Sequence, residues 1–259
     1  MRRPTLVLLA LLFCVPSCGS SDTGPTDAEL AMAGRSAALD ATLLATLADT
    51  LLFDLDETLD PSQDAAAAAA AIGQYATAAL AGCGTLTTSA TQIAAQLGTG
   101  CTLPSGTTVA GSVQAVVSRA NASAPLSIAL SFAATVDGYS LAGTATFSTT
   151  DARTFSVQAQ LQSSSGTYTV RCGEGVLKAD GTASGSAGGL SYSATLTALE
   201  HPLGVCFPDA GQVGLTHEGF TSRVVFATTS GTTGEVTLVK SGSSSSAVTL
   251  PAYGTCPGH

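Results

Sequence analysis

The chain has 259 residues, of which 45% are hydrophobic and only 10% charged, and its formal net charge is -9. This length suffices for one large or two small domains, and the apolar content suffices for a core. An acidic chain without a basic cluster is poorly suited to nucleic acid or to anionic lipid headgroups, so we exclude both as binding partners. The acidic residues concentrate before Cys83, where they would keep an alanine-rich region soluble.

Residues 1–17 have the pattern of a signal peptide. Arg2 and Arg3 precede an apolar core over residues 5–15 that is too short to span a bilayer. The segment ends in Val15-Pro16-Ser17-Cys18, which resembles the cleavage motif of bacterial lipoprotein precursors, although Pro16 departs from the usual residue there. The resemblance implies a lipid on Cys18, a flexible tether over residues 18–26, and an outer-membrane lipoprotein facing the periplasm or the cell surface. The alternative is a secreted protein with an ordinary cleavage site.

Residues 27–82 indicate a segment of two helices. The first part, residues 27–59, has leucines four residues apart, which predicts one stripe of an amphipathic helix: Leu39, Leu43, Leu47, Leu51 and Leu55. Pro61 ends this pattern. A second helix is predicted over residues 62–81, through a run of alanines, the residue with the highest helix propensity.

The stretch Phe53-Asp54-Leu55-Asp56-Glu57-Thr58-Leu59 resembles the first motif of haloacid-dehalogenase-like phosphatases. The resemblance would make Asp54 the phosphoryl-accepting nucleophile and Asp56 the general acid. That chemistry also needs a preceding strand, a parallel sheet, a later lysine and a further acidic pair for magnesium. Here the preceding residues are helix-periodic, and no acidic pair follows Asp64. We therefore interpret the two aspartates as the exposed acidic end of a helix and expect no enzyme activity.

Residues 83–259 are predicted to form an antiparallel β domain. Apolar residues recur at every second position in segment after segment, as at Leu126, Ile128, Leu130 and Phe132, which is typical of strands with one buried face. The breaks between segments are too short for crossover helices. The chain is therefore expected to be mainly β with an N-terminal helical segment (α+β). The β part would be an antiparallel meander that forms a curved sheet, a sandwich or an open barrel.

Glycine-containing pairs mark the expected turns of this meander. Asp137-Gly138 is the clearest hairpin turn, and Asp180-Gly181 and Gly188-Gly189 are two more. Ser184-Gly185-Ser186 is also interpreted as a turn, not as a nucleophile motif. The outward positions of the strands are mainly Ser, Thr and Gln. A carbohydrate-binding surface and a high-GC coding bias would both produce that choice.

An exported chain meets an oxidising compartment, so its cysteines are expected to form disulfides. Cys83 and Cys101 flank a strand and its turn, and we predict that they are bonded. Cys206 and Cys256 lie in Pro/Gly-rich segments that bracket the last strands, and we predict a second bond between them. Cys172 is left over; the main alternative is a Cys172–Cys206 bond that leaves Cys256 unbonded.

Six residues near the C-terminus are of the types that bind zinc: His201, Cys206, Asp209, His217, Cys256 and His259. None of them has a recognised ligand spacing. We therefore predict no metal and no cofactor.

These patterns favour a lipid-anchored cell-envelope protein with a structural or binding role and no catalytic one. Its partners would be the membrane, through the N-terminal lipid, and an unidentified protein or glycan. The alternative is a periplasmic carrier, in which the curved sheet encloses an apolar or lipid ligand and the helices plug its mouth; this is an analogy of architecture. A filled concave face would favour the first function, and a continuous cavity of several hundred Å3 the second.

Overall fold

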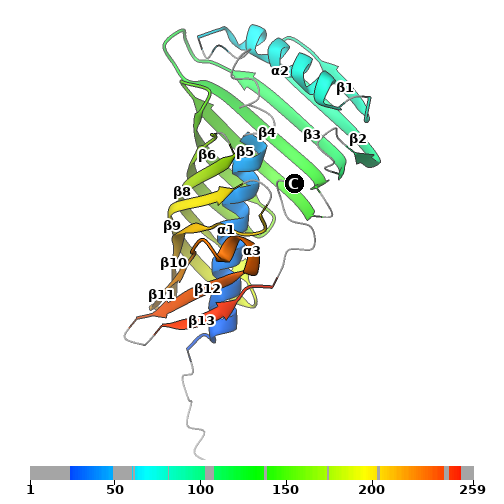
Figure 1. Ribbon diagram of the computed structural model, residues 1–259. Coiled ribbons are helices and arrows are strands. Elements are labelled where there is room, and N and C mark those ends of the chain that lie inside the picture. Colours follow the sequence, from blue (N-terminus) through cyan, green and yellow to red (C-terminus); the bar gives the residue numbers. More distant parts are fainter. Residues whose placement is uncertain are drawn as a thin grey trace, which may run out of the picture.

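The computed structural model describes residues 24–48, 60, 62–80, 82–102, 108–136, 139–173, 175–202, 205–241 and 245–251. Within these residues, thirteen strands form one sheet in which each strand pairs antiparallel with its neighbours along the chain (Figure 1). The strands are β1 (Thr85–Thr88), β2 (Gln92–Thr102), β3 (Thr108–Ser118), β4 (Leu126–Val136), β5 (Tyr139–Thr149), β6 (Thr154–Leu161), β7 (Ser164–Arg171), β8 (Val176–Ala187), β9 (Leu190–Pro202), β10 (Ala210–His217), β11 (Phe220–Val225), β12 (Glu235–Lys240) and β13 (Ser246–Thr249).

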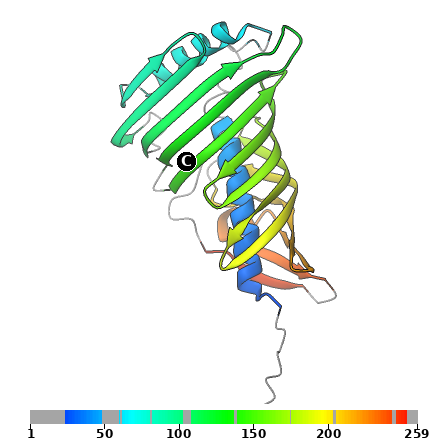
Figure 2. The same ribbon diagram turned by 180° about the vertical axis from the view of Figure 1, so that it is seen from behind.

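The predicted fold class is confirmed. The sheet is a meander, and it stays open because β1 and β13 are its two edges and do not pair with each other. Figures 1 and 2 show that it twists and curls, so that β1 to β5 and β8 to β13 lie at opposite ends of the molecule.

The inner face of the sheet carries the residues that the period-two pattern predicts. Leu126, Ile128 and Leu130 are all buried. Phe147 and Phe155 are also buried and meet edge to face, with ring centroids 6.4 Å apart. Burial of such side chains supplies about 1.5–3 kcal/mol each relative to exposure, so this face is the main source of stability.

Helix α1 (Asp27–Ala48) lies along the concave side of the sheet, which curls around it (Figures 1 and 2). It packs against every strand from β7 to β13. Its buried residues cover more of the helix than the predicted leucine stripe, because alanines also face the sheet: Leu30, Ala31, Ala33, Ala37, Ala38, Ala41, Leu43, Leu44, Ala45 and Ala48. Of the predicted stripe, Leu43 is buried and Leu39 is half-buried, so the helix buries a wider face than the stripe alone.

Small residues allow α1 to approach the sheet closely. A Cβ atom added to Gly34 would lie 2.5 Å from Cγ2 of Val224 on β11. No real Cβ atom tolerates such a distance, so this crossing depends on glycine. The remainder of the predicted first helix, with Leu51, Asp54, Leu55 and Asp56, lies outside the described residues.

Helix α2 (Ala65–Leu80) matches the second predicted helix within a few residues and packs against β1, β2 and β3 at the other end of the sheet. Asp64 starts it, because its Oδ1 accepts a hydrogen bond of 2.8 Å from the backbone N–H of Ala67. Ala68, Ala69 and Ile72 form its buried side. In the part of the chain that the structure describes, we find no helix with the length and apolar character needed to cross a membrane.

Two predicted turns are wrong. Asp180-Gly181 and Ser184-Gly185-Ser186 both lie inside β8. The register shifts at Asp180, where the carboxylate Oδ1 accepts a hydrogen bond of 2.6 Å from the N–H of Ala198 on β9. Asp180 thus accepts a hydrogen bond from a backbone donor at a β-bulge. The Asp-Gly pair therefore marks a bulge within a strand and not a hairpin turn.

The predicted Gly188-Gly189 turn is confirmed. Gly188 and Gly189 join β8 to β9 with φ values of 61° and 84°, which other residues rarely adopt. Asp137-Gly138 lies outside the described residues, but Val136 and Tyr139 on either side of it pair directly.

The predicted Cys83–Cys101 disulfide is confirmed, with the two Cα atoms 5.4 Å apart. It ties the short connection between α2 and β1 to β2. Cys206 is also disulfide-bonded. Cys256 lies outside the described residues, so the Cys206–Cys256 pairing stays a prediction. Cys172 is buried in the core.

Candidate functional site: a hydroxyl-lined hollow on the outer face

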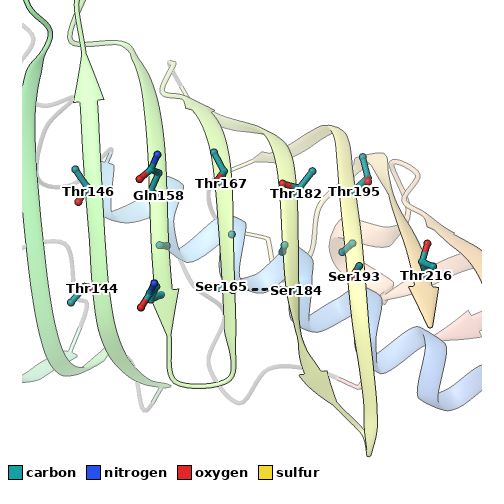
Figure 3. Close-up of a pocket in the computed structure, with 15 residues that line it drawn as sticks. Thr144, Thr146, Gln158, Ser165, Thr167, Thr182, Ser184, Ser193, Thr195 and Thr216 are labelled. Carbon is teal, nitrogen blue, oxygen red and sulfur yellow. Dashed lines mark hydrogen bonds between the residues drawn. The ribbon is translucent and has the colours of Figure 1, made fainter. Parts of the chain in front are cut away.

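Two rows of polar side chains cross the outer face of the sheet, which is the face turned away from α1 (Figure 3). They exist because residues alternate in direction along a strand, so the inward apolar positions leave every second position facing solvent. In what we call the threonine row, each member pairs with the next across β5 to β9: Thr146, Gln158, Thr167, Thr182 and Thr195. The serine row runs across β5 to β10: Thr144, Gln160, Ser165, Ser184, Ser193 and Thr216.

The two rows line a hollow of about 770 Å3. A second hollow of about 560 Å3 shares Thr195 and Thr216 with the first and extends to Arg223 and Lys240. The second hollow differs in character, because Leu215, Val239 and the two cations line it beside hydroxyl groups.

The side chains of both rows are uncharged, and each hydroxyl or amide is both a donor and an acceptor of hydrogen bonds. Among the described side chains of the rows, the one hydrogen bond between members joins Ser165 Oγ and Ser184 Oγ at 3.2 Å (Figure 3). The remaining hydroxyls and amides are therefore available to water or to a ligand.

Charged residues near this surface are held by partners. Lys178 Nζ donates to Glu200 Oε1 at 2.6 Å on β8 and β9. Arg223 Nη1 donates to Gln212 Oε1 at 3.4 Å. The charges thus lie at the margins, and the rows themselves stay neutral.

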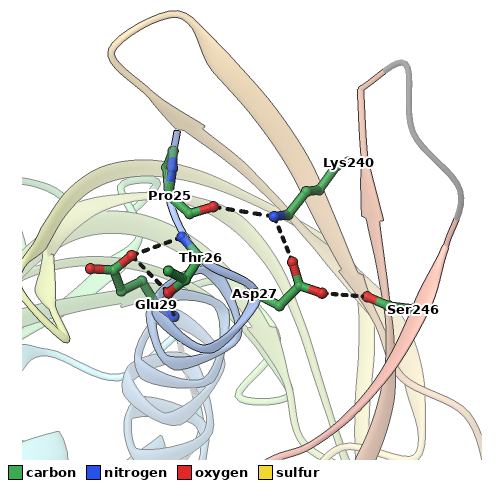
Figure 4. Close-up of polar contacts among 6 residues, drawn as sticks. All are labelled: Pro25, Thr26, Asp27, Glu29, Lys240 and Ser246. Carbon is green, nitrogen blue, oxygen red and sulfur yellow. Dashed lines mark hydrogen bonds and ion pairs between the residues drawn. The ribbon is translucent and has the colours of Figure 1, made fainter. Parts of the chain in front are cut away.

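Lys240 belongs to a contact that fastens the start of α1 to the last two strands (Figure 4). Its Nζ donates to Asp27 Oδ1 at 2.5 Å and to the carbonyl of Pro25 at 3.2 Å. Ser246 Oγ donates to Asp27 Oδ2 at 2.8 Å. The hydrogen bond from Lys240 is the main cause that lowers the pKa of Asp27. These bonds have a structural role, because each joins α1 or the residues before it to β12 or β13.

A capping box closes the same helix end. Thr26 and Glu29 exchange hydrogen bonds, with the N–H of Thr26 donating to Glu29 Oε2 at 2.8 Å and the N–H of Glu29 donating to Thr26 Oγ1 at 3.2 Å. The bond from the Thr26 backbone is the largest cause that lowers the pKa of Glu29.

A buried polar cluster lies on the other side of the sheet, between α1 and β7 to β9. Ser164 Oγ donates to Asp40 Oδ2 at 2.5 Å, and Asp40 is only 8% exposed. Burial raises the pKa of Asp40 to about 6, against the opposing effect of the Ser164 hydroxyl. Burial likewise raises the pKa of Tyr168 and of Tyr192, with Asp40 adding to both. The cluster is closed to solvent, so we assign it to folding and not to ligand binding.

Among the described residues, the structure does not bring the candidate zinc ligands together. His201 Nε2 donates to the carbonyl of Val205 at 3.0 Å, and burial lowers the pKa of His201 to about 4. His217 Nδ1 lies 2.6 Å from the carbonyl of Ser191. Within the described ranges, no three His, Cys, Asp or Glu side chains are close enough to hold a metal ion. Cys18, Cys256 and His259 lie outside these ranges.

The sequence predicts the outward Ser, Thr and Gln residues, but it does not predict that they line one site. Ser184 was not predicted as a site residue, because the sequence pattern around it was interpreted as a turn. The alternation Thr182-Ala183-Ser184, with Ala183 buried between two exposed hydroxyls, is the signal that could have identified it.

Comparison with known proteins adds no relative: no protein-family model, no curated protein and no solved structure matches the chain. The chemistry of the outer face is therefore the basis for assigning a function.

Proposed function

We propose that this protein is a lipid-anchored protein of the cell envelope with a binding role, and that the outer face of β5 to β10 is its binding surface. The observation that carries the proposal is the position of α1. The helix fills the concave side of β7 to β13, while the hollow of about 770 Å3 lies on the opposite face. A hollow of that size is within the range of ordinary ligand sites.

The proposal assigns no catalytic role to this surface. Its lining consists of hydroxyl, amide, methyl and backbone groups. Acid–base or nucleophilic catalysis needs a titratable side chain within hydrogen-bonding distance of the reacting atoms, and the first hollow has none in its lining.

The alternative function, a carrier for an apolar or lipid ligand, would require space on the concave face. There the side chains of Leu30, Leu44 and Ala37 are buried against the sheet. A carrier would therefore have to displace α1, and with it the contact of Asp27 with Lys240, before it could load a ligand.

The anchor is supported by the pattern around Cys18 and by the distance from it to the domain. Six positions separate Cys18 from Gly24, so even a fully extended chain spans about 20 Å or slightly more between them. An anchor on Cys18 would hold the start of α1 close to the membrane.

The anchor is tested by metabolic labelling with a fatty-acid analogue and by membrane fractionation. The wild type should carry the label and sediment with membranes, whereas Cys18→Ser should be unlabelled and soluble. Equal labelling of both proteins, or a soluble wild type, would contradict the anchor. Protease treatment of intact cells then distinguishes a surface-facing domain from a periplasmic one.

The carrier alternative is tested with the apolar fluorescent probe N-phenyl-1-naphthylamine. We expect no saturable increase in fluorescence with the purified protein, since α1 occupies the concave face. Saturation at one probe per chain would favour the carrier.

A further inference from the structure

We propose that the outer hollow binds an uncharged polysaccharide that lies across the strands from β5 to β10. This inference rests on the proposed function for the identity of the surface, and it specifies the ligand class.

The neutrality of the ligand follows from the two rows. Their members present hydroxyl and amide groups and no charge across five or six consecutive strands. A charged ligand would lose hydration without meeting an opposite charge there, whereas sugar hydroxyls donate and accept hydrogen bonds as the rows do. An apolar ligand would gain little, because apolar side chains of the strands point to the other face.

The length of the ligand follows from the weakness of each contact. The hollow has no aromatic side chain in its lining, so a sugar ring cannot stack there. A hydrogen bond formed at the expense of water stabilises by only about 0.5–1.5 kcal/mol. Affinity must therefore come from many contacts, which a polymer supplies and a single sugar does not.

The geometry of the rows suits a repeating molecule. Neighbouring strands lie about 4.8 Å apart, and outward residues follow each other at about 6.7 Å along a strand. The rows thus offer a regular lattice of donors and acceptors. The serine row crosses five inter-strand steps from β5 to β10, or about 24 Å along the curved surface.

The experiment is native affinity electrophoresis of the purified, exported protein in gels that contain dextran, galactomannan or hydroxyethylcellulose. Dextran sulfate serves as the charged comparison, and free glucose as the monomer. We expect retardation by at least one neutral polymer, dependent on its concentration and resistant to competition by free glucose.

The variant that tests the location is Thr167→Val with Thr182→Val. These residues face each other on β7 and β8 in the threonine row. Valine keeps the branched shape and removes two hydroxyls, so the dissociation constant should rise about tenfold, the equivalent of roughly 1.4 kcal/mol. Thr237→Val is the matched control. Thr237 is also exposed on a strand, between the buried Val236 and Leu238, but it lines neither hollow.

Retardation by no neutral polymer, or by dextran sulfate alone, would overturn the inference. Equal weakening by Thr237→Val would overturn the location. These outcomes can be told apart from those of the anchor test. If the wild type is labelled and membrane-bound but is not retarded by any neutral polymer, the anchor is supported and the polysaccharide proposal is wrong. Binding that survives a failed anchor test keeps the polysaccharide.

Discussion

At the scale of single residues, Asp40 shows how burial couples a side chain to pH. Its carboxyl group lies inside the molecule, and its pKa is raised from 3.8 to about 6. The folded state therefore holds the proton more tightly than the unfolded state does. The stabilisation from this proton is complete below about pH 4 and is lost as the pH rises through about 6.

The first prediction is that Asp40→Asn removes this dependence. Asparagine resembles the protonated aspartic acid and does not titrate. The free energy of unfolding of the variant minus that of the wild type should therefore rise by about 2 kcal/mol between pH 4.5 and pH 7. Urea denaturation followed by circular dichroism at both pH values measures it. A difference that is the same at both pH values would show that Asp40 titrates normally.

His201 is the reason for measuring this difference instead of the wild-type profile alone. Burial lowers the pKa of His201 from 6.5 to about 4, so its effect has the opposite sign. Stability is lost as the pH falls from about 6.5 to about 4, because His201 then binds a proton in the unfolded state but not in the folded state. In the wild type the two residues partly cancel, whereas subtracting the wild type from the variant removes the contribution of His201.

At the scale of elements, α1 depends on small residues more than on helix propensity. Glycine within a helix costs about 1 kcal/mol relative to alanine. Position 34 nevertheless requires glycine, because Val224 leaves no room for a Cβ atom there. Val224 is fully buried, and its branched side chain has few alternative rotamers.

We therefore predict that Gly34→Ala destabilises the protein by about 1–3 kcal/mol, in spite of the better helix propensity of alanine. Val224→Ala should relieve the clash, so the two changes should be less than additive in a double-mutant cycle. Chemical denaturation of the four proteins of the cycle measures both effects. A stabilised Gly34→Ala variant would mean that α1 moves away from β11 at no cost.

Most elements could be predicted from the sequence, because period-two alternation identifies a strand without knowledge of its neighbours. Leu190, Tyr192, Ala194 and Leu196 were assigned inward on that basis and are buried. The width of the buried face of α1 could not be predicted, because Ala33 and Ala37 carry no strong hydrophobic signal. The wrong turn at Asp180-Gly181 also reflects a contact that the local sequence does not show. The carboxylate of Asp180 binds a backbone N–H on another strand.

Only the residue types of the candidate site could be predicted from the sequence, and not their arrangement. Outward Ser, Thr and Gln residues follow from alternation, as in Thr144-Ala145-Thr146. Their alignment into rows depends on the register of several hairpins, and a shift by one residue would turn every side chain to the other face. The hollow depends on the twist of the whole sheet, which no local pattern encodes.

At the scale of the whole molecule, an open sheet must protect two edges against pairing with other chains. Both edge strands, β1 and β13, have only four residues. The Cys83–Cys101 disulfide adds a covalent bond at the first edge, between the residues just before β1 and the end of β2.

The prediction at this scale concerns that bond. Replacing both Cys83 and Cys101 by serine should lower the free energy of unfolding by about 3 kcal/mol, on the chain-entropy model for a loop of this length. Denaturation of the variant and the wild type without reductant measures the change and leaves the disulfide of Cys206 intact. A loss well below 1 kcal/mol would mean that the edge is held by α2 and by strand pairing alone.

The packing of α1 against β7 to β13 has a consequence for the order in which the protein folds. Each hairpin closes between segments that are adjacent in the chain, so strand pairing can proceed as soon as each segment is made. Helix α1 is synthesised before every strand, yet the strands that bury it are the last ones to appear. During synthesis its apolar side chains stay exposed until the C-terminal strands have been made. The first helix to be made is the last to be buried, and a chain truncated before β8 would leave it without its core.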